Sequence, residues 1–148
     1  MISTLQRLRE TTIDGENGFK TAAEDCADAN LKQTFLNLSL ERGRFSAELK
    51  DLLKQSGSDV DESGSLAGLM HRGWINVKSS VVAREDVAVL EECERGEDSA
   101  VKQYQEALAT NHLGGALAIV QRQYDHIERA HSLVKNLRDK IGAPTMAG

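Results

Sequence analysis

Glu128 and His131 form a Glu-x-x-His pair inside a segment with strong helical periodicity. The side chains that recur there at intervals of three and four residues are Leu117, Val120, Tyr124, Ile127, His131 and Val134. Residues three apart lie on the same side of a helix, so the carboxylate and the imidazole point the same way. Such a pair on the inward face of a helical bundle is a ligand set for a metal ion. One pair also arises by chance, so the rest of the chain must supply further ligands at the same depth.

Other glutamates interrupt or border the apolar stripes of the remaining helical segments. Glu16 and Glu94 take stripe positions, and Glu41 lies at the edge of a stripe. Glu97 is either an extra ligand or a solvated residue at the rim. Several carboxylates cannot be buried together as anions without shared protons, a cationic side chain or metal ions. Oxygen and imidazole ligands suit iron or manganese, and zinc also fits; otherwise no cofactor is indicated.

These residues must be positioned by helices. Ala, Leu, Glu, Lys, Arg and Gln dominate, the only proline is Pro144, and no strand-like alternation is present, which predicts an all-α fold. A chain of 148 residues fits one domain. We expect a single domain over residues 1–141 and a flexible tail over residues 142–148.

Charge and composition exclude several classes of partner. The net charge is −5, with acids and bases mixed along the chain, so no basic run indicates nucleic acid. No apolar run is long enough to span a membrane, and the N-terminus lacks the apolar core of a signal peptide. Cys26 and Cys93 suit a reducing compartment, and we expect a cytoplasmic protein without a disulfide between them.

Periodicity predicts four long helices and a helical crossover. The expected ranges are about 3–28, 31–55, 86–110 and 111–140, with the crossover at about 65–81. Ser3 or Thr4, Asp86 and Asn111 are the expected N-caps. An antiparallel hairpin turning near Ala29 would set Glu16 level with Glu41.

The second hairpin gives a similar pair. If it turns near Asn111, Glu94 and Glu128 stand at one level. Joining the two hairpins requires a return crossing of the bundle. The segment from Ser65 to Val81 would extend about 25 Å as a helix, which is the length needed.

The segments 14–20, 71–74 and 90–98 resemble a bacterial four-helix-bundle family of unknown function within the ferritin-like superfamily. The resemblance covers nearly the whole chain. The superfamily pattern is one Glu, then Glu-x-x-His, then the same again. The resemblance therefore implies metal ligands at Glu16, Glu41, Glu94, Glu128 and His131. Arg44 stands in place of the first histidine of that pattern, and an arginine stays protonated and cannot ligate a metal.

Two functions remain open from the sequence. The first is a metal-binding ferritin-like bundle with a degenerate di-metal site, for which the resemblance implies handling of iron with dioxygen or peroxide. The second is a non-catalytic helical structural or interaction protein in which Arg44 neutralises the carboxylates. The sequence does not decide whether the protein is an enzyme. Two-fold assemblies are the commonest, so we expect a homo-oligomer, with a dimer favoured, that uses crossover residues such as Leu69 and Trp74.

Overall fold

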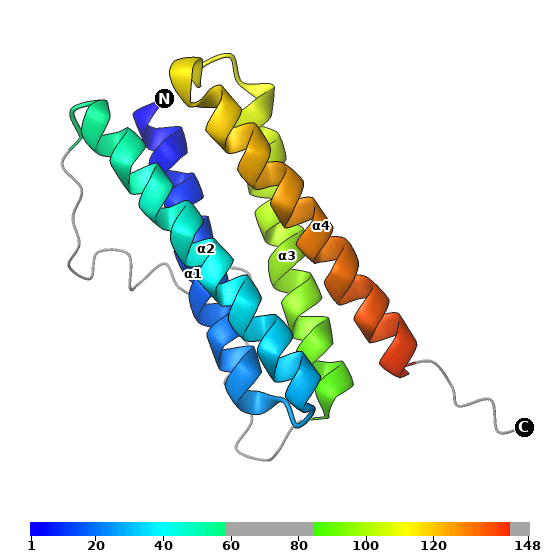
Figure 1. Ribbon diagram of the computed structural model, residues 1–148. Helices are drawn as coiled ribbons and strands as arrows, with labels where there is room; N and C mark the ends of the chain where they lie inside the picture. Colours follow the sequence, from blue (N-terminus) through cyan, green and yellow to red (C-terminus); the bar gives the residue numbers. More distant parts are fainter. Residues whose placement is uncertain (59–84, 143–148) are drawn as a thin grey trace, which may run out of the picture.

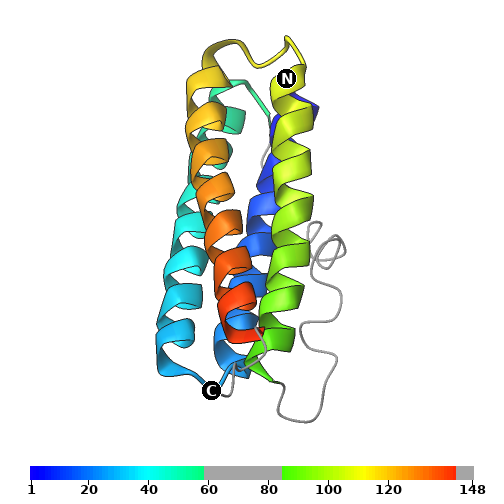
Figure 2. The same ribbon diagram turned by 90° about the vertical axis from the view of Figure 1, so that its right-hand side faces the viewer.

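The computed structural model describes residues 1–58 and 85–142 and is a bundle of four long helices. The elements in chain order are α1 (Ile2–Asp25), α2 (Ala29–Gln55), α3 (Asp86–Ala109), the short 3-10 helix η2 (Gly114–Ala116) and α4 (Leu117–Gly142). Helices α1 and α2 run antiparallel as one hairpin, and α3 and α4 form a second (Figures 1 and 2). The prediction of an all-α four-helix bundle built from two antiparallel hairpins is confirmed.

The four helices form a ring in which α2 and α3 face each other across the diagonal. Helix α1 packs against α2 and α3, and α3 packs against α4. Side chains close the remaining side of the ring: Arg122 of α4 forms an ion pair with Glu48 of α2, and Nε2 of Gln123 donates to the Phe45 carbonyl at 3.3 Å. A residue that points inward from α2 can therefore meet one that points inward from α3.

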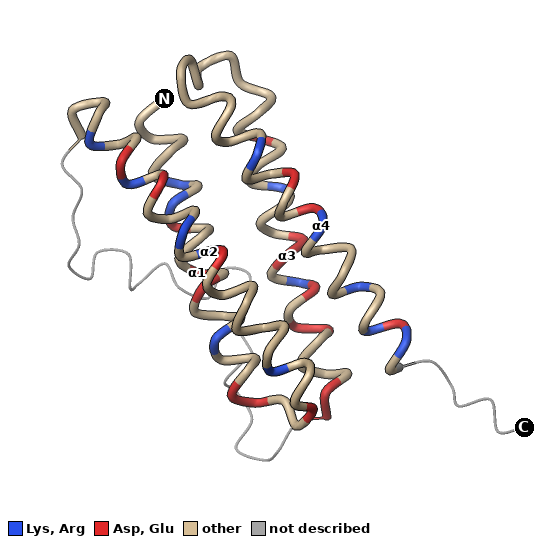
Figure 3. Tube along the Cα trace, viewed as in Figure 1, with Lys and Arg blue, Asp and Glu red and all other residues tan. Residues whose placement is uncertain are grey.

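The two hairpins are connected between opposite ends of the bundle, as the predicted return crossing requires. Gln55 ends α2 at one end, and Asp86 begins α3 at the other (Figure 1). The helix predicted for residues 65–81 lies outside the described residues, as do His71, Leu69 and Trp74. The described helices include none long and apolar enough to cross a membrane, and acidic and basic residues are interspersed along the bundle (Figure 3).

Asp86 joins the start of α3 to the turn of the first hairpin. Its two carboxylate oxygens accept hydrogen bonds from the backbone N–H groups of Ala27 (2.7 Å) and Asp28 (3.1 Å). The N-cap of α3 is Glu85, so the expectation that Asp86 caps its own helix is wrong. The carboxylate satisfies donors of another segment instead.

Two other predicted caps are also wrong. Helix α1 begins at Ile2 after Met1, without a side-chain cap, and α4 begins at Leu117, six residues beyond Asn111. The side chain that does cap a helix is Asp28, which accepts from the Leu31 N–H at 2.9 Å at the start of α2.

The core consists of two apolar clusters with a charged layer between them. One lies toward the α1–α2 turn and contains Phe19, Ala22, Ala23, Cys26, Leu31, Phe35, Leu38, Val89, Leu90, Cys93, Ala130 and Val134. The other lies toward the opposite end and contains Leu5, Leu8, Phe45, Leu49, Leu53, Ala100, Tyr104, Ala107, Leu113, Ala116, Val120 and Ile127. Arg42 and Glu97 fall between the two clusters along their helices, and both are fully buried. The two buried cysteines, Cys26 and Cys93, are not joined by a disulfide.

Candidate metal-binding site

The middle of the bundle holds a buried ion pair that spans its diagonal. Nη2 of Arg42 lies 2.5 Å from Oε2 of Glu97, and both side chains have an exposed fraction of 0%. The guanidinium also lies over the Phe19 ring, with Cζ 5.3 Å from the centroid. Burial disfavours the charged guanidinium, but the charge and hydrogen bond of Glu97 outweigh it and raise the pKa of Arg42. The bundle interior therefore carries its own cation.

Gly15 makes room for this cation. A Cβ atom at Gly15 would lie 2.9 Å from Nη1 of Arg42, so any larger residue would press on the guanidinium. In the described part of the chain, Nε and Nη1 of Arg42 and Oε1 of Glu97 have no hydrogen-bond partner. The interpretation of Glu97 as a solvated rim residue is wrong, because its carboxylate is fully buried.

The cation among the interior carboxylates is Arg42, and Arg44 is exposed. Two residues correspond to about 200° of rotation around a helix, so the two side chains cannot share a face. Arg42 lies on the stripe between Leu38 and Phe45, which are both buried. The expectation that Arg44 neutralises the carboxylates is therefore wrong for this bundle.

Glu16 and Glu41 lie at similar levels of the first hairpin, as counting from the turn predicts. Their side chains, however, lie at different helix–helix contacts. The Glu16 carboxylate lies beside Gly43, where a Cβ atom would be 2.6 Å from Oε2. This places it at the contact between α1 and α2. Oε2 of Glu41 lies 3.6 Å from Nδ1 of His126, within ion-pairing distance, between α2 and α4.

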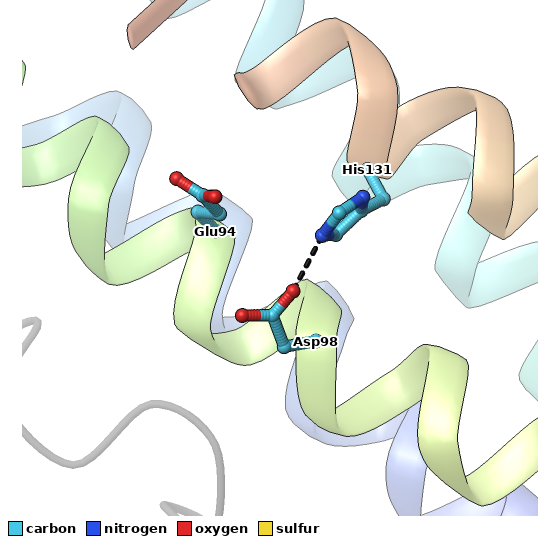
Figure 4. A group of neighbouring side chains, drawn as sticks. All are labelled: Glu94, Asp98 and His131. Carbon is cyan, nitrogen blue, oxygen red and sulfur yellow. Dashed lines mark hydrogen bonds and ion pairs between the residues drawn. The ribbon is translucent and has the colours of Figure 1, made fainter.

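The second hairpin brings together Glu94 and His131 and adds Asp98. Asp98 points at His131 of α4, and Glu94 projects from the preceding turn of α3 beside them (Figure 4). One ligand atom from each residue lies within 4.8 Å of the other two. The closest approach is 2.5 Å, between Nε2 of His131 and Oδ1 of Asp98. The structure thus places a histidine and two carboxylates from two helices at one point.

Glu128 lies apart from this cluster. Its side chain is exposed and accepts a hydrogen bond from the Tyr124 hydroxyl, which in turn accepts one from Gln105 at 3.1 Å. The bond to Glu128 raises the pKa of Tyr124. Metal ligation by Glu16, Glu41 and Glu128 stays a prediction, and the group that meets at ligand spacing within the described residues is Glu94, Asp98 and His131.

The length of the connection explains the displaced level of Glu128. Asp98 faces His131 and Tyr104 faces Gln123, with the Tyr104 hydroxyl donating to Gln123 at 2.7 Å. The hairpin therefore turns near Gly114 rather than near Asn111, because irregular chain and η2 precede α4. Each residue of α3 consequently faces a residue about one and a half to two turns further along α4 than a turn at Asn111 predicts.

Small residues explain why Glu16 and Glu94 lie at the margins of their helix contacts. On α1 the buried positions include Gly15 and Gly18, and on α3 they include Cys93 and Gly96. These small side chains allow close approach of neighbouring helices, which rotates the larger polar residues beside them toward the edge. Glu94 is accordingly only partly buried, with 15% of its side chain exposed.

The Glu94–Asp98–His131 cluster fits a divalent metal ion by its donor atoms and spacing. A tetrahedral site with zinc–ligand distances of about 2.0–2.2 Å separates its ligand atoms by about 3.4 Å, so the hydrogen-bonded His131–Asp98 pair must open by about 1 Å before an ion fits between them. One carboxylate oxygen, Oε2 of Glu94, is buried and accepts no hydrogen bond within the described residues, although Arg138 forms an ion pair with it. Exposed fractions of 25% for His131 and 63% for Asp98 leave the cluster open to solvent.

Asp98 is the ligand candidate that sequence reasoning missed. It follows Glu94 by one helical turn and lies on the same edge of α3, so the signal was an i, i+4 carboxylate pair. The pairing with His131 becomes visible only with the correct turn position. Arg42 carried a clearer signal, because an arginine at an apolar stripe position must find an anion in the interior.

Comparison with known proteins gives a family without an assigned function. Residues 1–110 match the family described as "Domain of unknown function (DUF2383)", and the chain belongs to that family. The match includes α1, α2 and α3 and ends before α4, so His131 lies outside it. No curated protein matches the chain.

Proposed function

We propose that the protein binds one divalent metal ion at the α3–α4 edge of the bundle through Glu94, Asp98 and His131. The observation that carries this proposal is the meeting of their ligand atoms within 4.8 Å from two different helices. The shared hydrogen bond between His131 and Asp98 occupies the place that a metal ion would take. Binding would thus replace a proton between the imidazole and the carboxylate.

One imidazole and two carboxylates suit zinc, manganese or ferrous iron. The buried Arg42–Glu97 pair supplies the charge balance that a metal pair would otherwise provide in the interior. We therefore propose a single-ion site at the edge, as a degenerate form of the ferritin-like arrangement. Iron chemistry with dioxygen or peroxide is implied by the resemblance alone, and the proposal is limited to ion binding.

Metal analysis and titration test the proposal. Protein stripped with chelator is titrated with Zn²⁺, Mn²⁺ and, anaerobically, Fe²⁺, and compared with His131→Ala and His126→Ala. His126 is the matched control because it lies on the same helix but contacts Glu41 and Phe45 of α2. We expect about one bound ion in the wild type and in His126→Ala, and loss of binding in His131→Ala. Equal binding by both histidine variants would refute the assignment.

A second candidate function is a helical interaction protein that acts as a homo-oligomer. It is favoured by the protein-only charge balance of the interior and by leucines on the outer face of the first hairpin, with Leu40 61% and Leu36 42% exposed. We propose a dimer, the commonest assembly. Light scattering should give twice the chain mass of 16.2 kDa, and Leu40→Glu should lower it to the monomer. A monomeric wild type at working concentration would rule this candidate out.

A further inference from the structure

Arg138 lies beside the proposed metal site and holds one of its ligands. It follows His131 by two turns on α4, and its Nη1 forms an ion pair with Oε2 of Glu94. The other side of the same guanidinium donates to Oδ1 of Asp139, from Nε at 3.2 Å and from Nη2 at 2.8 Å. Hydrogen bonding to Asp139, with the charge of Glu94 adding to it, raises the pKa of Arg138.

We infer that Arg138 competes with the metal ion for Glu94, so that the last turns of α4 set the metal affinity of the site. This inference rests on the proposed function and names its regulation. A guanidinium does not lose its proton and cannot ligate a metal, so it can only occupy the carboxylate or leave it. A divalent ion next to it would also be repelled by its charge. Arg138 and the metal ion therefore compete for the negative charge of Glu94, whichever of its two oxygens the ion takes.

The structure provides a place for the displaced guanidinium. The Arg138 side chain is 31% exposed, and Asp139, which is 57% exposed, holds it from the solvent side. When metal takes Glu94, Arg138 keeps its hydrogen bonds to Asp139 and gives up only the inner contact. Metal loading is thus coupled to release of the C-terminal turns of α4 from α3. Any anion that draws Arg138 outward raises the metal affinity by the same route.

The test compares Arg138→Gln with Arg129→Gln in the full chain. Both changes remove one positive charge from α4, and Arg129 is exposed, so the second variant controls for net charge. Chelator-stripped protein is titrated with Zn²⁺ against a chromophoric chelator. We expect Arg138→Gln to bind Zn²⁺ about tenfold more tightly than the wild type, with Arg129→Gln within about twofold of it. Arg138→Lys retains the charge and should stay near the wild type.

Thermal melts give a second readout. In EDTA, Arg138→Gln should melt at or below the wild-type temperature, because an ion pair is lost. With Zn²⁺ its melting temperature should rise more than that of the wild type, because binding to the folded state is stronger. A purely structural role for Arg138 would lower both melts equally and would overturn the inference.

The outcomes separate this inference from the proposed function. If the wild type binds Zn²⁺, His131→Ala does not, and Arg138→Gln binds no more tightly than the wild type, the competition is refuted and the site stands. If neither the wild type nor Arg138→Gln binds, both proposals fall. If Arg138→Gln alone binds, the competition is supported and the native chain is not a metal protein under these conditions.

Discussion

Glu94 and Glu97 lie one turn apart on α3, and their charges are compensated in opposite ways. Glu97 points into the bundle, where Arg42 neutralises it in a fully buried contact. Glu94 lies at the edge, where it is shared between Arg138 and a cluster with Asp98 and His131. A buried charge needs a partner built into the fold, because desolvation is otherwise too costly. A charge at the edge can exchange one partner for another, which is the property that a binding site requires.

The largest expected effect comes from breaking the interior pair. Arg42→Met leaves Glu97 buried without a cation and should lower the free energy of unfolding by about 3–5 kcal/mol. Arg44→Met is the matched control, because Arg44 is exposed, and it should change stability by less than about 0.5 kcal/mol. Urea denaturation in EDTA measures both.

The double variant Arg42→Met/Glu97→Met sharpens this result. It replaces two buried charges by apolar side chains of similar length and should recover most of the stability lost in Arg42→Met. Equal loss in the single and double variants would show that packing, and not charge, is what Arg42 contributes. Equal losses of stability in Arg42→Met and Arg44→Met would contradict the claim that the buried charge on Glu97 depends on Arg42.

The next effect concerns the space that the interior pair occupies. Gly15→Ala places a Cβ atom 2.9 Å from a guanidinium that is buried and ion-paired, and it should cost about 1–3 kcal/mol despite the better helix propensity of alanine. At Gly43 the nearest atom is the carboxylate of Glu16, which is only partly buried and can rotate away. Gly43→Ala should therefore be close to neutral. Thermal melts of the two variants that shift equally would show that the interior is as adaptable as the surface.

A smaller effect on stability is expected where a carboxylate accepts hydrogen bonds from backbone N–H groups instead of pairing with another charge. Asp86→Ala removes both acceptors of the Ala27 and Asp28 N–H groups and should lower the free energy of unfolding by about 1–2 kcal/mol. Glu85→Ala at the neighbouring position should be nearly silent, since Glu85 makes no side-chain cap. Hydrogen exchange at the Ala27 and Asp28 amides should be faster in Asp86→Ala. Unchanged exchange would contradict the hydrogen bonds from these amides to Asp86.

The sequence predicts the helices well, because long periodic stripes of Leu, Phe and Val leave few alternatives. Counting residues from the α1–α2 turn also predicts which residues of the first hairpin face each other. Glu16 does lie opposite Gly43, two residues from Glu41. For the second hairpin, the same counting predicts the wrong pairing of residues between α3 and α4. Asn111 looks like a cap, but the chain continues through η2 before α4 begins, and periodicity alone cannot measure an irregular connection.

The site is less predictable than the fold because side-chain direction depends on which residues allow close packing. Stripes read from large apolar residues put Glu94 on the inward face, whereas the helix turns its small residues, Cys93 and Gly96, inward. One residue corresponds to about 100° of rotation, so this small difference moves Glu94 to the edge and leaves Glu97 inside. Arg42 could have been distinguished from Arg44 by its place on the apolar stripe, but its partner Glu97 becomes visible only in the structure.

The smallest expected effect is at the edge cluster without metal. Asp98 is 63% exposed, so its contact with His131 is screened by solvent, and Asp98→Asn should change the free energy of unfolding in EDTA by less than about 1 kcal/mol. The contrast with Arg42→Met then reflects burial, since each variant removes one charged group from a side-chain contact of α3. Addition of Zn²⁺ should separate them further: Arg42→Met keeps its metal-dependent rise in melting temperature, whereas Asp98→Asn loses most of it, because only Asp98 contributes a ligand atom. A wild-type melting temperature that does not respond to Zn²⁺, Mn²⁺ or Fe²⁺ would leave the two regions different in burial but not in function.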